Sequence, residues 1–143
     1  MSFSVDAISP KNSSTVTIAG NYTNVPHETT LSAPLIDSGS TITNCTALAT
    51  IFEGKVHLYL YNCTMTPLDG TVVTSALIPP NMAPPTDVYF STYHADYQDG
   101  AFKGIGSVKI GSDGVVTFYY DSAGSGWPAS TYVLGGSELV YRL

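Results

Sequence analysis

The sequence predicts an all-β protein, an antiparallel β-sandwich or barrel of about eight to ten short strands. Thr, Val and Tyr recur in short alternating stretches, and such residues suit a pleated, half-buried surface. The 13 glycines and 9 prolines interrupt most windows that could hold three helical turns. Only 11% of the residues are charged, against about 25% in ordinary soluble domains, so Ser, Thr and Asn supply much of the polar surface. The 143 residues suffice for one domain with a substantial core.

The stretch 44–67 organises the rest of the chain, because it reads as two strands that fold back at Glu53-Gly54-Lys55. With Gly54 at the centre of the turn, Cys45 faces Cys63. Alternate residues of a strand share a face, and both faces of this hairpin are apolar. Either the hairpin is central in a sandwich, or a second copy of the chain covers one face. The second interpretation predicts an oligomer interface through Ile51, His57, Tyr59 and Tyr61.

The segments on either side of this hairpin set the domain organisation. We expect residues 41–143 to form the head domain and residues 1–40 to form an extended N-terminal arm or neck, which is either separate from that domain or part of it. Within the arm, residues 14–19 alternate as a short strand. Residues 30–42 contain another strand, closed by the turn Asp37-Ser38-Gly39.

The second half of the chain alternates short strands with turns. Residues 79–85 contain four prolines, which cannot donate to a ladder, so this segment is predicted to cross over outside the sheet. At Ser112-Asp113-Gly114 a three-residue loop pairs Ile110 with Val116 and gives Gly114 the positive φ that such a loop requires. The predicted strands are residues 71–78, 87–93, 102–110, 131–134 and 138–143.

From the central hairpin onward, the order of these features resembles the C-terminal head, or knob, domain of bacteriophage receptor-binding proteins and tail fibres. The matching features are the Gly-turned hairpin, residues 77–80, Pro84-Pro85, the hairpin of residues 110–119, and the loop with Trp127 and Pro128. The resemblance implies a homotrimer that adheres to a bacterial surface, commonly to a saccharide. It also implies a place at the tail tip of a virion assembled in the host cytoplasm, beside other tail proteins.

Composition excludes several classes of function. A net charge of −6 with only five basic residues cannot supply the Lys and Arg clusters that bind nucleic acid. No apolar run approaches the roughly 18 residues of a membrane span, and the N-terminus lacks the pattern of a signal peptide. Motifs of nucleophilic, zinc-dependent or phosphate-binding enzymes are missing. We therefore expect a non-enzymatic protein without a cofactor.

The loop around residues 93–99 carries the candidate site. Sugars are held by aromatic faces together with groups that hydrogen-bond hydroxyls, and this loop offers both. Asp96 and Asp99 have no enforced separation that would make them a glycosidase pair. With His94 they are only a weak metal signal, so no metal is predicted. Alternatively, Trp127 and Tyr93 plug the ends of the core. The predicted saccharide-binding residues are Tyr93, His94, Asp96, Tyr97, Gln98, Asp99 and Trp127.

The two cysteines allow a disulfide or two buried thiols. Directly opposite positions bring their Cα atoms close enough for a bond. The resemblance places assembly in a reducing cytoplasm, which favours free thiols. Four Asn-x-Ser/Thr sequons, at Asn12, Asn21, Asn44 and Asn62, are expected by chance in an Asn- and Thr-rich chain.

The leading hypothesis for function is a trimeric viral adhesion head that binds a bacterial cell-surface saccharide without covalent chemistry. A second hypothesis is a structural tail or baseplate module that binds no sugar. A third is a secreted carbohydrate-binding or adhesive domain of cellular origin, in which the sequons would carry glycans.

Overall fold

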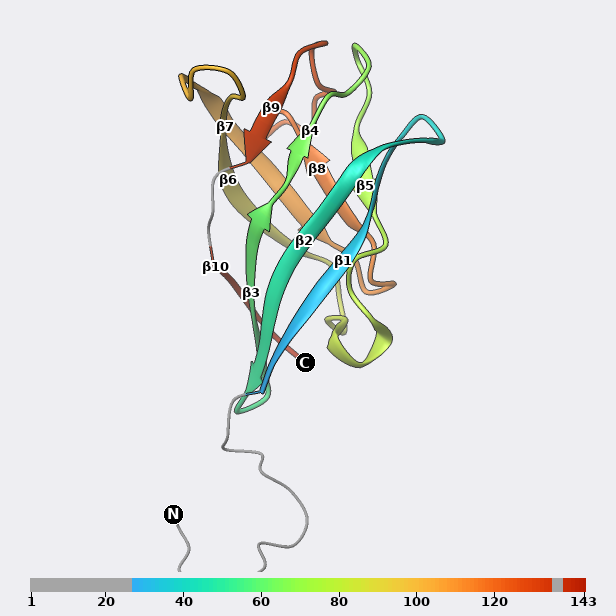
Figure 1. The fold of residues 1–143 in the computed structure, drawn as a ribbon. Coiled ribbons are helices and arrows are strands. Elements are labelled where there is room, and N and C mark those ends of the chain that lie inside the picture. Colours follow the sequence, from blue (N-terminus) through green and yellow to red (C-terminus); the bar gives the residue numbers. More distant parts are fainter. Residues whose placement is uncertain (1–26, 135–137) are drawn as a thin grey trace, which may run out of the picture.

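The computed structural model describes residues 27–134 and 138–143. They form one curled antiparallel sheet of ten strands, in the order β10-β3-β2-β1-β5-β8-β7-β6-β9-β4 (Figure 1). The predicted all-β class is therefore confirmed. The strands are β1 (His27–Asp37), β2 (Ser40–Phe52), β3 (Lys55–Asn62), β4 (Thr64–Met65), β5 (Val73–Ser75), β6 (Val88–Asp96), β7 (Phe102–Ile110), β8 (Val116–Tyr119), β9 (Tyr132–Leu134) and β10 (Glu138–Arg142).

The first strands of this order, β10 and β3, and the last, β9 and β4, form one continuous ladder. β10 pairs with β3, placing Glu138 opposite Tyr59, and β9 pairs with β4, placing Val133 opposite Thr64. Both pairings are antiparallel and share one register, and between them the Leu134 N–H donates to the Cys63 carbonyl at 3.1 Å. Because β4 continues β3 and β9 also pairs with β6, the sheet closes on itself as a barrel.

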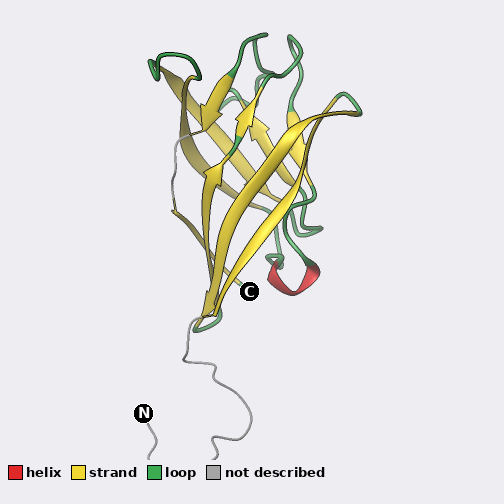
Figure 2. Ribbon diagram, viewed as in Figure 1, coloured by secondary structure: helices red, strands yellow, loops and turns green. Residues whose placement is uncertain are grey.

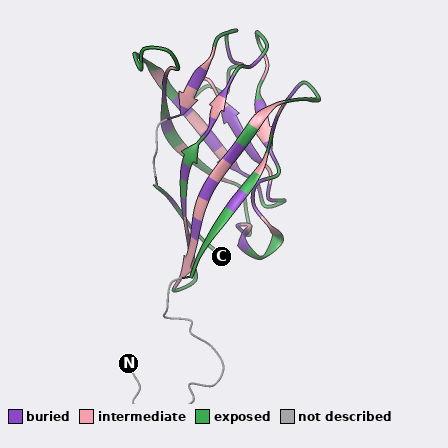
Figure 3. Ribbon diagram, in the orientation of Figure 1, coloured by how far each residue is buried: buried purple, intermediate pink, exposed green. Residues whose placement is uncertain are grey.

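Burial alternates along the strands, as Figure 3 shows. On the central hairpin the inward positions carry Ala47 and Ala49 from β2 and Val56, Leu58 and Leu60 from β3, all of them buried. They pack in one core with residues of β5, β7 and β8 from the opposite wall. Each wall of the barrel thus has one apolar face and one face turned outward.

The register predicted for the central hairpin is wrong by one residue. Phe52 pairs with Lys55 and Ile51 with Val56, so the turn has only two central residues, Glu53 and Gly54, with φ of 51° and 74°. Two residues at positive φ give a turn whose twist matches the strands. The shift also moves Ile51 to the inner side, where it packs against the core. It therefore does not share the outward face of the other predicted interface residues, His57, Tyr59 and Tyr61.

A bulge corrects the register before the cysteines. Ala47 pairs with Leu60 and Thr46 with Asn62, which leaves Tyr61 as an extra residue in β3. Cys45 already points inward by the alternation of β2, and the bulge in β3 turns Cys63 inward to meet it. Both are buried, with Cα atoms 4.8 Å apart. The two residues form a disulfide, so the expectation of free thiols is wrong.

The segments outside the central hairpin follow the turn chemistry of the sequence. β1 ends at Asp37 and pairs with β2 along its whole length, so residues 27–37 belong to the same sheet as the head. The predicted strand at residues 14–19 lies outside the described residues. The prediction for residues 71–78 is too long, because only Val73–Ser75 form β5. The proline segment leaves the sheet and contains a 3-10 turn at Pro80–Met82, the only helix among the described residues (Figure 2).

The loop between β7 and β8 has the predicted three-residue form. Ile110 pairs with Val116, the Gly111 N–H donates to the Val115 carbonyl at 2.8 Å, and Gly114 has φ +84°. A Cβ on Gly114 would lie 2.3 Å from the Ile78 carbonyl oxygen. Position 114 therefore requires glycine for two reasons, the positive φ and the close approach of Ile78.

We expect Gly114→Ala to destabilise the fold more than Gly54→Ala. Both glycines have positive φ, where a side chain costs about 1–2 kcal/mol, but a Cβ on Gly54 meets nothing within 4 Å. Urea unfolding should show a loss of about 1 kcal/mol for Gly54→Ala and a clearly larger loss for Gly114→Ala. Equal losses would contradict the close packing of this loop on Ile78.

Candidate functional site

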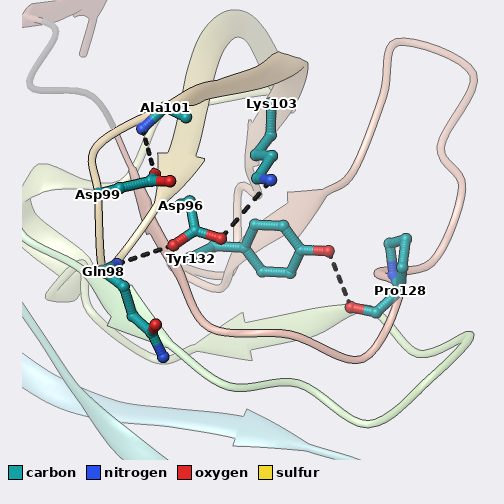
Figure 4. A network of polar contacts seen from close by, with 7 residues as sticks. All are labelled: Asp96, Gln98, Asp99, Ala101, Lys103, Pro128 and Tyr132. Carbon is teal, nitrogen blue, oxygen red and sulfur yellow. Dashed lines mark hydrogen bonds and ion pairs between the residues drawn. The ribbon is translucent and has the colours of Figure 1, made fainter.

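The loop between β6 and β7 is held by its own carboxylates (Figure 4). Asp96 Oδ1 accepts a hydrogen bond from the Gln98 N–H at 2.8 Å, and Asp99 Oδ1 accepts one from the Ala101 N–H at 2.8 Å. Lys103 Nζ lies 3.6 Å from Asp96 Oδ2. The Gln98 N–H, with a smaller contribution from Lys103, holds the pKa of Asp96 below its usual range. Asp96 thus stays ionised at neutral pH, which does not suit a general acid.

Four large apolar side chains are exposed around this loop. Tyr93 and Ile105 lie directly opposite each other on β6 and β7. Tyr97 stands in the loop, and Phe102 begins β7. Between 45% and 64% of each residue's surface is exposed, an unusual concentration on one hairpin end. We call this set, Tyr93, Tyr97, Phe102 and Ile105, the hairpin rim.

Beneath this end of the barrel lies a cluster of four rings, His94, Tyr120, Trp127 and Tyr132, which we call the aromatic cluster. The His94 ring centroid is 4.7 Å from that of Tyr120 and 5.0 Å from that of Trp127. Trp127 is fully buried, and its Nε1–H donates to the Phe118 carbonyl at 2.9 Å. The Tyr132 hydroxyl donates to the Pro128 carbonyl at 3.0 Å (Figure 4). The polar atoms of Trp127 and Tyr132 are thus both hydrogen-bonded within the protein, as buried Trp and Tyr require.

His94 is the titratable member of the aromatic cluster. It is fully buried, with Nε2 2.9 Å from the Tyr120 carbonyl oxygen, to which Nε2–H donates. Nδ1 has no hydrogen-bond partner among the described residues. Burial lowers the pKa of His94, and the hydrogen bond to Tyr120 offsets only part of this effect. The neutral ring is therefore the form that the fold accommodates.

The structure separates the predicted saccharide-binding residues into two groups. Tyr93, Tyr97, Gln98 and Asp99 are exposed, and Asp96 is half-buried at the edge of the loop. His94 and Trp127 are buried and cannot present a ring to a ligand. Trp127 is part of the core, as the alternative interpretation of the sequence expected.

The prediction also missed three residues of this hairpin, namely Phe102, Lys103 and Ile105. The alternation of β7 contained a signal for Ile105, because a strand that buries Val108 and Ile110 turns Ile105 outward. Phe102 carried no such signal. Simple alternation would place it on the inner face, but a register shift leaves Lys103 unpaired and sets Phe102 opposite Ala95. The alternation is therefore interrupted, and Phe102 is exposed at the start of β7.

The described residues form neither a metal-binding cluster nor a membrane-spanning helix. Within residues 27–134 and 138–143, no three side chains of the His, Cys, Asp or Glu type are grouped so that they could hold a metal ion. The same part of the chain contains no helix long and apolar enough to cross a membrane.

No protein-family model matches the chain, and no curated protein sequence matches it.

The lowered pKa of His94 predicts a stability that falls on mild acidification. Above the ordinary pKa near 6.5 the ring is neutral in both states and the fold keeps its full stability. As the pH drops from there toward the lowered folded-state pKa, the unfolded chain takes up the proton first and stability is lost. Thermal unfolding between pH 8 and 5 should show this loss in the wild type and in His57→Gln. His94→Gln, whose amide can still donate to Tyr120, should flatten it; an unchanged slope would contradict the assignment.

Proposed function

We propose that this protein is a non-catalytic adhesion head of a bacteriophage tail that binds a bacterial cell-surface saccharide through the hairpin rim. The observation that carries the proposal is the exposure of Tyr93, Tyr97, Phe102 and Ile105 at one hairpin end. The order of sequence features that resembles phage receptor-binding heads supports the viral context.

The chemistry of the rim suits a sugar better than it suits an apolar partner. Aromatic faces pack against the C–H patches of sugar rings, and polar groups must then meet the hydroxyls. The same hairpin end carries the Gln98 amide in its loop and the Lys103 ammonium at the start of β7. Two Asx turns hold the loop in shape before any ligand arrives. A preorganised loop loses little conformational freedom on binding, so a shallow site can still give useful affinity.

Replacing a rim tyrosine should remove adhesion without loosening the fold. We expect Tyr97→Ala to weaken binding to host cells or wall polysaccharide by about tenfold, if a sugar ring gains from one aromatic face about what a nucleic-acid base does, roughly 1–3 kcal/mol. Its thermal midpoint should stay within a degree or two of the wild type, because Tyr97 is 59% exposed.

Tyr89→Ala is the matched control, since Tyr89 is a similarly exposed tyrosine of β6 outside the rim. It should leave saccharide binding unchanged. Equal binding by Tyr97→Ala and the wild type would exclude the rim, and a wild type that binds no saccharide would favour a structural tail module.

The proposal includes a homotrimer formed through the outer face of β3 and β10. On this face Tyr59 and Tyr61 are 43% and 48% exposed, and their rings stack with centroids 6.2 Å apart. Val140, opposite His57 in the ladder, extends the face and is 41% exposed. Exposed apolar surface of this kind is typical of an interface between proteins, and three copies would multiply weak saccharide sites by avidity.

Light scattering should give three times the 15.1 kDa chain mass at micromolar concentration. Tyr61→Asp should reduce the assembly to monomer, because it places a charge in an apolar contact. Tyr97→Asp, an equivalent change on the hairpin rim, should leave the mass unchanged. A wild type that scatters as a monomer would contradict the proposed assembly.

One observation favours a second candidate, a secreted adhesive domain of cellular origin. The Cys45–Cys63 disulfide is typical of proteins that mature in oxidising compartments. Asn44 and Asn62, each followed by a disulfide cysteine and a threonine, are exposed and could accept glycans. Expression through a eukaryotic secretory pathway, followed by glycosidase treatment and mass measurement, tests whether these positions are glycosylated.

A further inference from the structure

The barrel wall is split between β6 and β10. β6 pairs with β9 only from His94 to Asp96. Beyond that point the chain of β9 continues as β10, which pairs with β3 and with no other strand of the described residues. The two strands therefore diverge, and a groove of about 490 Å³ lies between them. Its volume is in the range of ligand sites.

Both sides of this groove are strand edges. The half of β6 from Val88 to Tyr93 pairs with β7 on one side, and among the described residues no strand pairs with its other side. The same holds for β10 opposite β3. Alternate backbone N–H and C=O groups of both strands thus point toward the groove, and such edges are templates for another extended chain.

The walls between the edges are mostly apolar. Pro84 and Pro85 close one end, Val88 and Val140 line the sides, and the rings of Phe90 and Tyr141 meet with centroids 6.4 Å apart. The buried Tyr141 hydroxyl donates to the Met82 carbonyl at 3.0 Å, which fixes the proline segment against β10. The groove is therefore a formed feature of the fold.

Its charged residue is Arg142, which lies directly opposite Lys55 in the β3–β10 ladder. Like charges in this position repel each other, and among the described residues no carboxylate lies within 4 Å of either cation. The acid beside the groove, Asp87, is already paired with Lys109 at 3.0 Å. In a chain of net charge −6, this arrangement attracts an anionic group.

We propose that the groove binds a short extended peptide segment of a partner protein, which carries an acidic residue and pairs with the free edges of β6 or β10. The backbone edges supply the hydrogen bonds, the apolar walls accept alternate side chains, and Arg142 with Lys55 receives the carboxylate. This is strand addition, in which main-chain bonds give affinity and side-chain contacts give specificity. Because β6 and β10 run in opposite directions, the segment is antiparallel to one edge and parallel to the other.

Two labelled six-residue peptides test this on the full chain. Both alternate Thr and Val with blocked termini, and they carry one Asp at the N-terminal or the C-terminal end. Fluorescence anisotropy should show binding of at least one peptide, and amide hydrogen exchange should slow at Val88–Tyr93 and Glu138–Arg142. The same peptide N-methylated at alternate bonds should not bind, because it lacks the donors. Absence of binding by both peptides at millimolar concentration, or equal binding of the N-methylated form, overturns the proposal.

The charge is tested by Arg142→Gln, which should weaken binding about three- to fivefold at low salt. Lys103→Gln, which removes a cation at the other end of the barrel, at the start of β7, should leave peptide binding unchanged. Equal effects of the two substitutions overturn the role of Arg142. Protection of the same edges by a uronic-acid oligosaccharide but not by the peptides assigns the groove to a sugar and overturns the proposal. Protection of Val88–Tyr93 that appears on raising the protein concentration alone assigns the groove to a second copy of the chain, with the same consequence. The β6 edge decides this outcome, because β10 also lies in the proposed trimer face.

Discussion

The antiparallel ladder that joins β3 and β4 to β10 and β9 is the constraint on which the rest of the barrel depends. Without it the strands would form an open sheet with two edges, and the core between the walls would face water. The ladder closes the barrel fully where β9 also reaches β6, near His94. Where β10 takes the place of β9, nothing bridges to β6 among the described residues. The barrel is therefore closed at the end that carries the hairpin rim and split toward the proline segment.

The shape of the closed end depends on the aromatic cluster and on two glycines of β7, Gly104 and Gly106. The aromatic cluster fills the space under the hairpin, and glycine is required beside it. A Cβ on Gly106 would lie 2.6 Å from the Tyr119 carbonyl oxygen, and one on Gly104 would lie 3.2 Å from His94 Cε1. His94 and Trp127 thus contribute to the site from below, because they support the strands that display Tyr93 and Ile105. A rigid support of this kind lets exposed side chains hold their positions before a ligand binds.

Local turn chemistry in the sequence was sufficient to predict the all-β class, the crossover of the proline segment and the three-residue loop at Gly114. The central hairpin was predicted in the wrong register because two compensating features are invisible to periodicity. Glu53 takes a positive φ that is uncommon for its residue type, which shifts the register of the hairpin by one residue. The bulge at Tyr61 shifts it back, so that Cys45 again lies opposite Cys63. For the site, residue types indicated the right loop. They could not separate Tyr93 from His94, which are neighbours in sequence but point to opposite sides of the wall.

The cations of the described residues differ in whether a carboxylate lies beside them. Lys103 and Lys109 each neutralise an aspartate that also caps a loop, so their charges stabilise the loops around β6 and β7. Lys55 and Arg142 instead lie side by side at the split end. A ligand on the hairpin rim would be held chiefly by neutral rings, whose contacts depend little on ionic strength. A ligand in the groove would meet the positive charge of Arg142, with Lys55 opposite it in the ladder, and added salt screens such charges near the surface. Salt dependence therefore distinguishes the two sites even when one partner presents both a sugar and an acidic segment.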